Sequence, residues 1–479
     1  MTEYEVIIGL EVHVELSTES KIFCGCPTAF GGDPNTHVCA ICSGMPGTLP
    51  TLNRDVLRYA VRAGLATHCD ITRNGKFDRK NYFYPDLPKA YQISQLYLPI
   101  CRNGYIEIGE GDARKKIRIH EMHMEEDAGK LIHDVEDKCT LVDYNRCGVP
   151  LIEIVSEPDF RSAEEVVDYL ERLKTTLQYI GVSDCKMQEG SMRADINLSV
   201  RPIGEEKLGT RTEMKNMASL KAIARAIEAE SKRQIERLRT GKTIKQQTRR
   251  WDDEKGVSFS MRTKENAHDY KYFPEPDLLP LQVSPEMIAE IAREIPELKE
   301  VRKERYVREL SLPEYDADIL TGSYPLVRIF ERTAEICGNP KEASNWIMTD
   351  LLKLMKDAQC PPEDLKIPED ALGRIISMVS AGQINRTVGR TVLGEVFESN
   401  VDPLEYVEKN GLAMVSDKSV IEDAIGRVLE ENPKAVEDYR AGNPKSVQFL
   451  IGQSMRILRG KADPQAVQAI LFDHLEKLR

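Results

Sequence analysis

The sequence contains no run of about 18 apolar residues, so it offers no candidate for a membrane-spanning helix. It begins Met-Thr-Glu-Tyr-Glu, without the basic start and the apolar stretch of a secretory signal, and we expect a cytoplasmic protein with no membrane partner. Two catalytic patterns are missing as well, because neither a Gly-x-x-x-x-Gly-Lys-Ser/Thr loop nor a Gly-x-Ser-x-Gly turn occurs. The first of these absences excludes a P-loop nucleotidase.

An excess of positive charge is also lacking, since the formal net charge is -12. Proteins that coat nucleic acid use clustered Lys and Arg to neutralise phosphates, so this balance argues against such a general role. One segment differs from the acidic chain as a whole, because it lacks acidic residues and contains five basic ones: Arg440, Lys445, Arg456, Arg459 and Lys461. This segment is either a local basic contact surface or an ordinary solvated helix face.

The 11 cysteines do not suit a disulfide framework, because their number is odd and we expect the chain in the cytoplasm. Four of them form two close pairs in the pattern C-x-C-x12-C-x2-C, namely Cys24, Cys26, Cys39 and Cys42. Tetrahedral zinc coordination requires such close pairs on tight turns, and four sulfur ligands leave no open position for a substrate water. The spacing predicts a structural zinc site, and the alternative is a set of reduced thiols that has lost the metal.

The length of 479 residues is too great for one ordinary hydrophobic core. Hydrophobic residues make up 41% and charged residues 30%, the balance of a soluble globular protein. Strand, turn and helix patterns mix up to about residue 290, and a composition shift at Pro280 leads into helical patterns that continue to the end. We predict an α+β fold with a domain at 1–290 built on a mainly antiparallel sheet, an all-α domain at 291–405 and a small helical tail domain at 406–479.

The stretch from Gly9 to Leu16 alternates strictly between apolar and polar side chains. At the two-residue period of a strand, one face is apolar and the other carries a row of carboxylate, imidazole and carboxylate, namely Glu11, His13 and Glu15. Taken alone, this pattern fits an exposed strand with a solvated polar face.

Further carboxylates fall on other predicted strands. Residues 116–126 end in Glu125 and Glu126, which would face opposite sides of an extended strand and reach one site only if the backbone bends. Glu153 stands alone in the apolar run 150–156, where a carboxylate is costly unless it is paired or coordinates a cation. Polar residues also alternate with apolar ones from Asp195 to Arg201, and Glu213 lies on a strand at 209–216.

Together these strands offer five carboxylates and one imidazole to a common face: Glu11, His13, Glu125, Glu126, Glu153 and Glu213. Oxygen-rich ligation suits Mg²⁺ or Mn²⁺ rather than a second zinc, and Mg²⁺ sites of this kind commonly handle phosphates. By elimination, the set favours metal-assisted phosphoryl transfer.

Two irregular aromatic loops interrupt this region. Residues 77–92 combine two prolines, which forbid regular structure, with aromatic and basic side chains in a composition that suits a binding surface. We assign four residues of this loop to cofactor binding: Arg79, Lys80, Tyr82 and Tyr84. The alternative is an aromatic-anchored loop packed on the core. Residues 269–277 echo the composition of this loop.

Several long blocks of the sequence resemble the B subunit of the tRNA-dependent glutamyl/aspartyl amidotransferases. The blocks are Ile8–Leu16, Phe77–Gln95, His123–Lys130, Pro150–Pro158 and Tyr270–Pro276, and the match continues through Ser344-Asn345-Trp346 to Gly452-Gln453. The resemblance implies a cradle-shaped kinase domain, a helical domain and a tail that contacts tRNA.

The resemblance also implies an activity. Such a subunit uses ATP and Mg²⁺ to phosphorylate the side-chain carboxylate of Glu on tRNA(Gln) or of Asp on tRNA(Asn), and ammonia then displaces the phosphate. The six strand residues match the family's cation site, and Lys89 and Glu126 match its tunnel gate. We assign Glu125, Glu126 and Lys89 as catalytic residues. All four cysteines of the family's variable cluster are present, which agrees with structural zinc.

Partners are implied in the same way. The chain lacks the Ser-Ser-Lys set of an amidase, so the resemblance implies a heterotrimer with an amidase subunit, which releases ammonia from glutamine, and a small third subunit. Misacylated tRNA(Gln) or tRNA(Asn) would be the substrate. The rival hypothesis is a non-catalytic subunit for tRNA binding and assembly, in which the strand carboxylates are structural.

Overall fold

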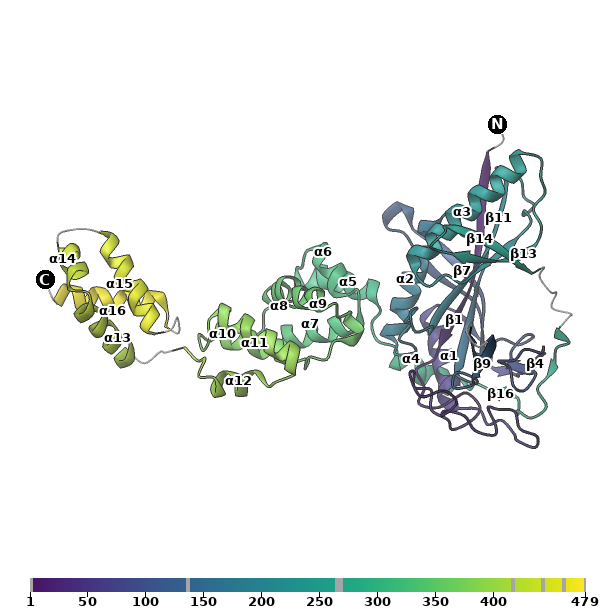
Figure 1. Cartoon of the computed structure of the whole chain (residues 1–479), viewed down its shortest axis with the longest axis horizontal. Helices are drawn as coiled ribbons and strands as arrows, with labels where there is room; N and C mark the ends of the chain where they lie inside the picture. The colour runs from purple at the N-terminus through teal and green to yellow at the C-terminus, as the bar shows by residue number, and fades with distance from the viewer. Residues whose placement is uncertain are drawn as a thin grey trace. The chain divides into compact units, whose positions relative to one another are not determined.

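The structure is a computed structural model that describes residues 3–134, 138–262, 270–414, 418–440, 444–458 and 462–477 (Figure 1). The chain divides into two compact units, residues 1–299 and 300–479. The predicted domain boundaries at residues 290 and 405 stay predictions.

The first unit is built on a nine-stranded sheet with the order β14-β13-β12-β11-β1-β10-β7-β6-β2. All neighbouring strands in it are antiparallel except β12 and β13, which confirms the predicted sheet type. Its strands are β1 (Tyr4–Glu15), β2 (Asp70–Ile71), β6 (Cys101–Ile108), β7 (Lys115–Glu126), β10 (Pro150–Ser156), β11 (Met192–Pro202), β12 (Thr212–Lys215), β13 (Gln247–Asp252) and β14 (Val257–Arg262).

Three small sheets hold the loops beside it, with the strand orders β15-β4-β5, β16-β3 and β8-β9. Their strands are β3 (Asn74–Gly75), β4 (Asp78–Asn81), β5 (Tyr91–Ser94), β8 (Lys130–Asp134), β9 (Cys139–Asp143), β15 (Phe273–Pro274) and β16 (Leu281–Gln282). The expectation that residues 77–92 are irregular throughout is therefore wrong. Both prolines lie between β4 and β5, so they interrupt only the connection and leave the two flanking strands free to pair.

The helices of the first unit are α1 (Arg54–Ala66), α2 (Ala163–Tyr179), α3 (Leu220–Arg239) and α4 (Pro285–Glu294). Helix α2 begins after Ser162, because the Ser162 side chain caps it by accepting a hydrogen bond from the Glu165 amide. The Glu165 carboxylate accepts from the amide of Arg161, one residue earlier than in a capping box. Apolar stripes of α1, α2 and α3 share one core with the apolar face of the sheet, as Figure 1 illustrates for α2 and α3.

The two faces of the sheet therefore have different surroundings. On β1, the side chains of Leu10, Val12 and Val14 are at most 1% exposed and belong to the helix-covered core. Glu11 and His13 lie on the opposite face and are half-buried. The alternation predicted for this strand is confirmed, and the face that the helices leave free is the face with the ionisable groups.

The second unit is helical in its described part. Its helices are α5 (Lys299–Leu310), α6 (Glu314–Leu320), α7 (Tyr324–Cys337), α8 (Pro340–Trp346), α9 (Leu352–Asp357), α10 (Ala371–Ser380), α11 (Arg386–Ser399), α12 (Pro403–Lys409), α13 (Lys418–Glu431), α14 (Pro433–Arg440), α15 (Pro444–Ile457) and α16 (Pro464–Lys477), with a π-helical turn at Ile347–Leu351. One apolar cluster spans Tyr306 to Val407 and another spans Ile421 to Leu475. The sheet-based first unit and the helical second unit confirm the α+β fold class.

Two residues of the predicted basic segment, Arg459 and Lys461, lie outside the described residues, as does the side chain of Arg440. In the described ranges, no helix combines the length and the apolar character needed to span a membrane.

Candidate active site and metal centre

His13, Glu125 and Glu153 form the first ionisable group on the free face of the sheet. They come from β1, β7 and β10, which are neighbours in the sheet, and His13 stands directly opposite Glu153 in the β-ladder. The His13 Nε2 atom lies 3.5 Å from a carboxylate oxygen of each glutamate. One ligand atom from each residue lies within 4.8 Å of the others, so the three could hold a single metal ion.

A second histidine extends this group. His123 stands opposite Glu153 on β7, and its Nε2 atom lies 3.2 Å from Glu153 and 3.9 Å from Glu125. Burial is the largest single influence and alone would lower the pKa values of both imidazoles, but the surrounding carboxylates, Glu153 first among them, together raise the pKa of His13 to about 9 and that of His123 to about 10. Without a cation, protonated imidazoles therefore balance the carboxylates, and a bound cation would take over that role.

The second group lies on the same face and consists of Glu11, Asp195 and Glu213, whose ligand atoms also lie within 4.8 Å of one another. Glu11 stands opposite Asp195 between β1 and β11, and Glu213 is on the next strand, β12. Lys215 forms ion pairs with Asp195 and with Glu213, the latter at 3.4 Å. Asn197 donates a hydrogen bond to Glu11 at 2.9 Å. This group thus has a lysine where the first has histidines.

Glu126 belongs to neither group. As the period of an extended strand requires, its side chain leaves β7 on the side opposite to Glu125 and accepts hydrogen bonds from Lys89 Nζ and from the Ile93 amide, the latter at 2.9 Å. Burial alone would lower the pKa of Lys89, and the Glu126 carboxylate raises it instead. The pair lines a cavity of about 250 Å³ that also reaches Lys21 and Cys42.

A second cavity, of about 260 Å³, includes His13 and Glu125 of the first group and Asp195 of the second group in its lining. Lys80 and Tyr82 also line it. Burial alone would lower the pKa of Lys80, but Glu125, Tyr272 and Glu153 raise it, so its ammonium group is charged. Two of the four residues assigned to cofactor binding therefore border the ionisable groups.

Arg79 and Tyr84 lie elsewhere. Arg79 is the neighbour of Lys80 on β4 and its guanidinium binds Glu275 at 2.6 and 2.9 Å and Asp277 at 2.8 Å. These bonds connect β4 to the second aromatic loop, as does the edge-to-face contact between the rings of Tyr82 and Tyr270. Tyr84 is 51% exposed and is absent from the lining of the 260 Å³ cavity.

Sequence reasoning missed three residues of the cavity. Arg193 stands opposite His13 in the ladder, borders the cavity and donates a hydrogen bond of 2.8 Å to Asp127, which also lines it. Asp195 completes the second group, although it was absent from the predicted ligand set. The signal that could have found Arg193 and Asp195 is the alternation of polar and apolar residues on β11. This pattern is visible in the sequence, but it does not reveal which strands lie beside β11.

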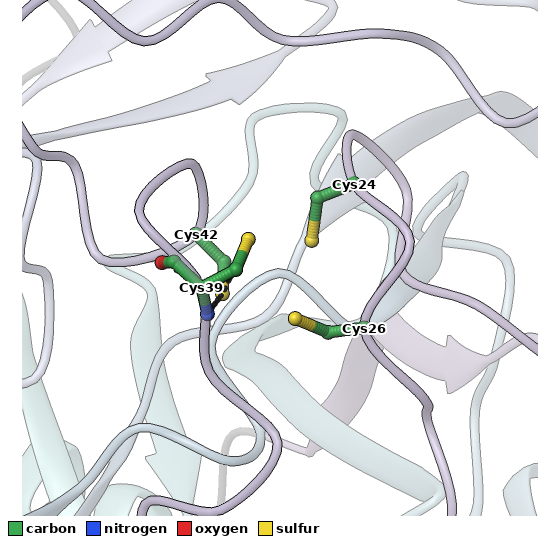
Figure 2. Close-up of side chains that lie close together, drawn as sticks. All are labelled: Cys24, Cys26, Cys39 and Cys42. Carbon is green, nitrogen blue, oxygen red and sulfur yellow. Dashed lines mark hydrogen bonds between the residues drawn. The ribbon is translucent and has the colours of Figure 1, made fainter.

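The four predicted zinc ligands come together on two loops, and their sulfur atoms lie within 4.8 Å of one another. Figure 2 shows the sulfur atoms of Cys24 and Cys26 pointing toward the other pair, Cys39 and Cys42. The Cys39 amide donates a hydrogen bond of 3.2 Å to the Cys42 sulfur. A hydrogen bond from Cys24 is the largest cause that lowers the pKa of Cys42, to about 4, and the Cys39 amide adds to this effect. The group is a possible four-cysteine metal site, compatible with structural zinc.

Comparisons with known proteins agree over the whole chain. A model of the GatB/GatE catalytic domain matches residues 6–289, and a model of the GatB domain matches residues 328–475. The chain is 60% identical to the B subunit of the aspartyl/glutamyl-tRNA(Asn/Gln) amidotransferase of Lachnoclostridium phytofermentans, with 100% of both chains covered. Proteins with the same name from Agathobacter rectalis and Caldicellulosiruptor saccharolyticus are each 55% identical to it, covering 99% of this chain and 100% of theirs.

Proposed function

Because the chain belongs to the family of the B subunits of the aspartyl/glutamyl-tRNA(Asn/Gln) amidotransferases, we propose that it activates misacylated tRNA for amidation by phosphorylating the aminoacyl side chain. The substrates are Glu-tRNA(Gln), Asp-tRNA(Asn) or both. A side-chain carboxylate is a poor acyl donor at neutral pH, and its conversion to an acyl phosphate supplies a leaving group.

The proposed reaction has two steps. The γ-phosphoryl group of ATP passes to a carboxylate oxygen of the substrate, the bond to the β-phosphate oxygen breaks, and ADP leaves. Ammonia then attacks the acyl carbon, phosphate departs with the bonding electron pair, and loss of a proton leaves the amide of Gln or Asn. The observation that carries this proposal is the cavity of about 260 Å³, whose lining includes His13 and Glu125 of the first group, Asp195 of the second group and the charged Lys80.

The donor set fits Mg²⁺. The two groups on the same sheet face provide five carboxylates, the hard oxygen ligands that this ion prefers, and one imidazole nitrogen: Glu11, Glu125, Glu153, Asp195, Glu213 and His13. When bound, Mg²⁺ supplies charge neutralisation of phosphate oxygens. Glu126 lies on the opposite side of β7, so we propose it instead as the partner of Lys89 at the point where ammonia arrives.

The chain's own cations have distinct tasks in this proposal. Lys80 reaches into the cavity beside Glu125 and Tyr82 and binds transferred or departing phosphate oxygens. Arg193, held by Asp127, also lines the cavity and orients the substrate there. Arg79 is occupied by Glu275 and Asp277, so its contribution is to hold strand β4, which carries Lys80 and leads into Tyr82.

We further propose that the four cysteines hold one structural zinc ion, because two close pairs of sulfur atoms converge on one point. The proposed partners are an amidase subunit that supplies ammonia, a small third subunit and the misacylated tRNA, and the proposed location is the cytoplasm.

The test is ATP hydrolysis by the assembled complex with Mg²⁺, compared among Glu-tRNA(Gln), Gln-tRNA(Gln) and no tRNA. We expect ADP release only with the misacylated species, because only that species presents a free side-chain carboxylate. Release that is indifferent to the aminoacyl group would contradict the phosphoryl-transfer assignment. Normal amide formation by a complex whose Glu125 is replaced would support the rival, a non-catalytic subunit for tRNA binding and assembly.

A further inference from the structure

Lys21 is a fully buried lysine beside the four cysteines, with 0% of its surface exposed. Its Nζ atom donates a hydrogen bond of 2.7 Å to the carbonyl oxygen of His37 and lies 3.4 Å from that of Tyr144. It also lies 3.6 Å from the sulfur of Cys42. The ammonium group therefore points into the metal site rather than into solvent.

The charge of this lysine has no carboxylate to balance it. In the described part of the chain, no Asp or Glu oxygen lies within 4.0 Å of Lys21 Nζ, whereas buried Glu126 already pairs with Lys89. A buried ammonium group needs an opposite charge as well as hydrogen bonds, because burial removes the hydration of the ion. Carbonyl oxygens provide only the hydrogen bonds.

A zinc ion with four thiolate ligands carries two excess negative charges, and these would balance the charge of Lys21 in place of a carboxylate. The backbone of Lys21 is joined to the site as well, since its amide donates to the Cys26 carbonyl at 2.9 Å. Lys21 thus contacts one cysteine pair through its main chain and the other through its ammonium group.

We propose that Lys21 is the buried counter-ion of the four-cysteine zinc centre and that its positive charge is part of what retains the metal. This inference rests on the proposed zinc binding. Its basis is the direct contact with Cys42, the complete burial and the absence of a carboxylate partner among the described residues.

The first measurement is zinc affinity by chelator competition on the full-length chain. Lys21→Met keeps the length of the side chain and removes its charge, and we expect about tenfold to 100-fold weaker zinc binding, as for other outer contacts of metal ligands. The control is Lys116→Met, because Lys116 is 57% exposed and contacts only the surface residue Glu107 among its described ion pairs. If Lys21→Met does not fold, Lys21→Gln replaces it, since the amide can still donate to a carbonyl without carrying charge.

A second measurement separates charge from packing. Cys26→His removes one negative charge from the centre, so the penalty of Lys21→Met should shrink in that background. The thermal midpoint of the metal-free chain should change little with Lys21→Met, whereas that of the zinc-bound chain should fall. Equal losses with and without zinc, or an equal penalty in both backgrounds, would show a merely structural lysine and overturn the inference.

The two proposals fail differently. A wild-type chain that binds no zinc would refute the zinc centre itself. A wild-type chain that binds one zinc ion, with unchanged affinity in Lys21→Met, would leave the zinc centre standing and refute the role of Lys21.

Discussion

The oxygen-rich groups of the sheet and the four-cysteine group of the loops both bring potential metal ligands together, but they do so with different backbone structures. On the sheet, the β-ladder fixes the ligands, as in the direct pairing of His13 with Glu153, and the groups border a cavity. In the cysteine group, two loops bring their sulfur atoms onto one point. Four sulfur ligands saturate a zinc ion, whereas carboxylates beside a cavity leave room for a substrate.

The positive side chains around the two kinds of site also differ. Each oxygen-rich group is flanked by positive side chains, His123 for the first and Lys215 for the second, and the cavity adds Lys80. The cysteine group has only the buried Lys21 in direct contact among the described basic residues. We therefore propose a catalytic role for the sheet groups and a stabilising role for the cysteine group, and the following substitutions separate these two roles.

The largest effect is expected from Glu125→Gln, which removes a carboxylate that is 3% exposed with little change in shape. We expect the ATP hydrolysis that depends on misacylated tRNA to fall by about 10³-fold, the upper range for loss of a preorganised charge-stabilising group. Thermal stability and bound zinc should stay near wild type. The measurement is initial-rate ADP release by the complex.

The control for this substitution is Glu107→Gln, because Glu107 is on β6 of the same sheet but its side chain is 45% exposed beside Lys116. It should retain wild-type turnover. Full activity of the Glu125 variant would remove the sheet groups from the chemistry.

The second effect is expected from Cys39→Ser, which removes one sulfur from the proposed zinc centre. Loss of a structural metal ligand should lower the thermal unfolding midpoint of the chain by about 5 °C or more, measured calorimetrically with zinc present. The ATP hydrolysis of the protein that is still folded at low temperature should stay within about twofold of wild type, because the centre lies outside the 260 Å³ cavity.

Cys360→Ser is the matched control, since Cys360 is in the helical unit and its thiol contacts only the Pro361 carbonyl among the hydrogen bonds of the described residues. It should change neither the midpoint nor the zinc content. A Cys39→Ser protein with normal stability but no activity would contradict the proposal that the cysteine group serves stability and not chemistry.

Sequence patterns predicted the strands of the sheet site well, because an alternating or continuous apolar pattern marks a strand and its buried face. The observed strand β10 coincides with the predicted run 150–156, and β1 shows the predicted alternation. The cysteine group was predicted from spacing alone, because close pairs on short loops need no knowledge of the rest of the fold.

The grouping of the ligands could not be predicted in the same way. Strand order decides that Asp195 joins Glu11, and this order depends on pairings between segments far apart in the chain. The split between Glu125 and Glu126 follows from the strand period, since β7 continues extended through both residues instead of bending between them. No pattern distinguishes Lys21 from a surface lysine, because its burial depends on loops that arrive from His37 and Tyr144.

The smallest effect is expected from substitutions on strand β4, where the adjacent basic residues Arg79 and Lys80 have different surroundings. Lys80→Met should raise the KM for ATP by about tenfold, roughly 1.4 kcal/mol, because Lys80 lines the 260 Å³ cavity and Arg79 does not. Arg79→Met should leave this KM within about twofold and lower the thermal midpoint instead. The substitution removes the guanidinium group that pairs with the fully buried carboxylate of Glu275. Steady-state kinetics and calorimetry on both variants give the answer. If Arg79→Met changed the KM for ATP as much as Lys80→Met, both side chains would contribute to ATP binding. The proposed division, in which Lys80 binds ATP and Arg79 stabilises β4, would then be wrong.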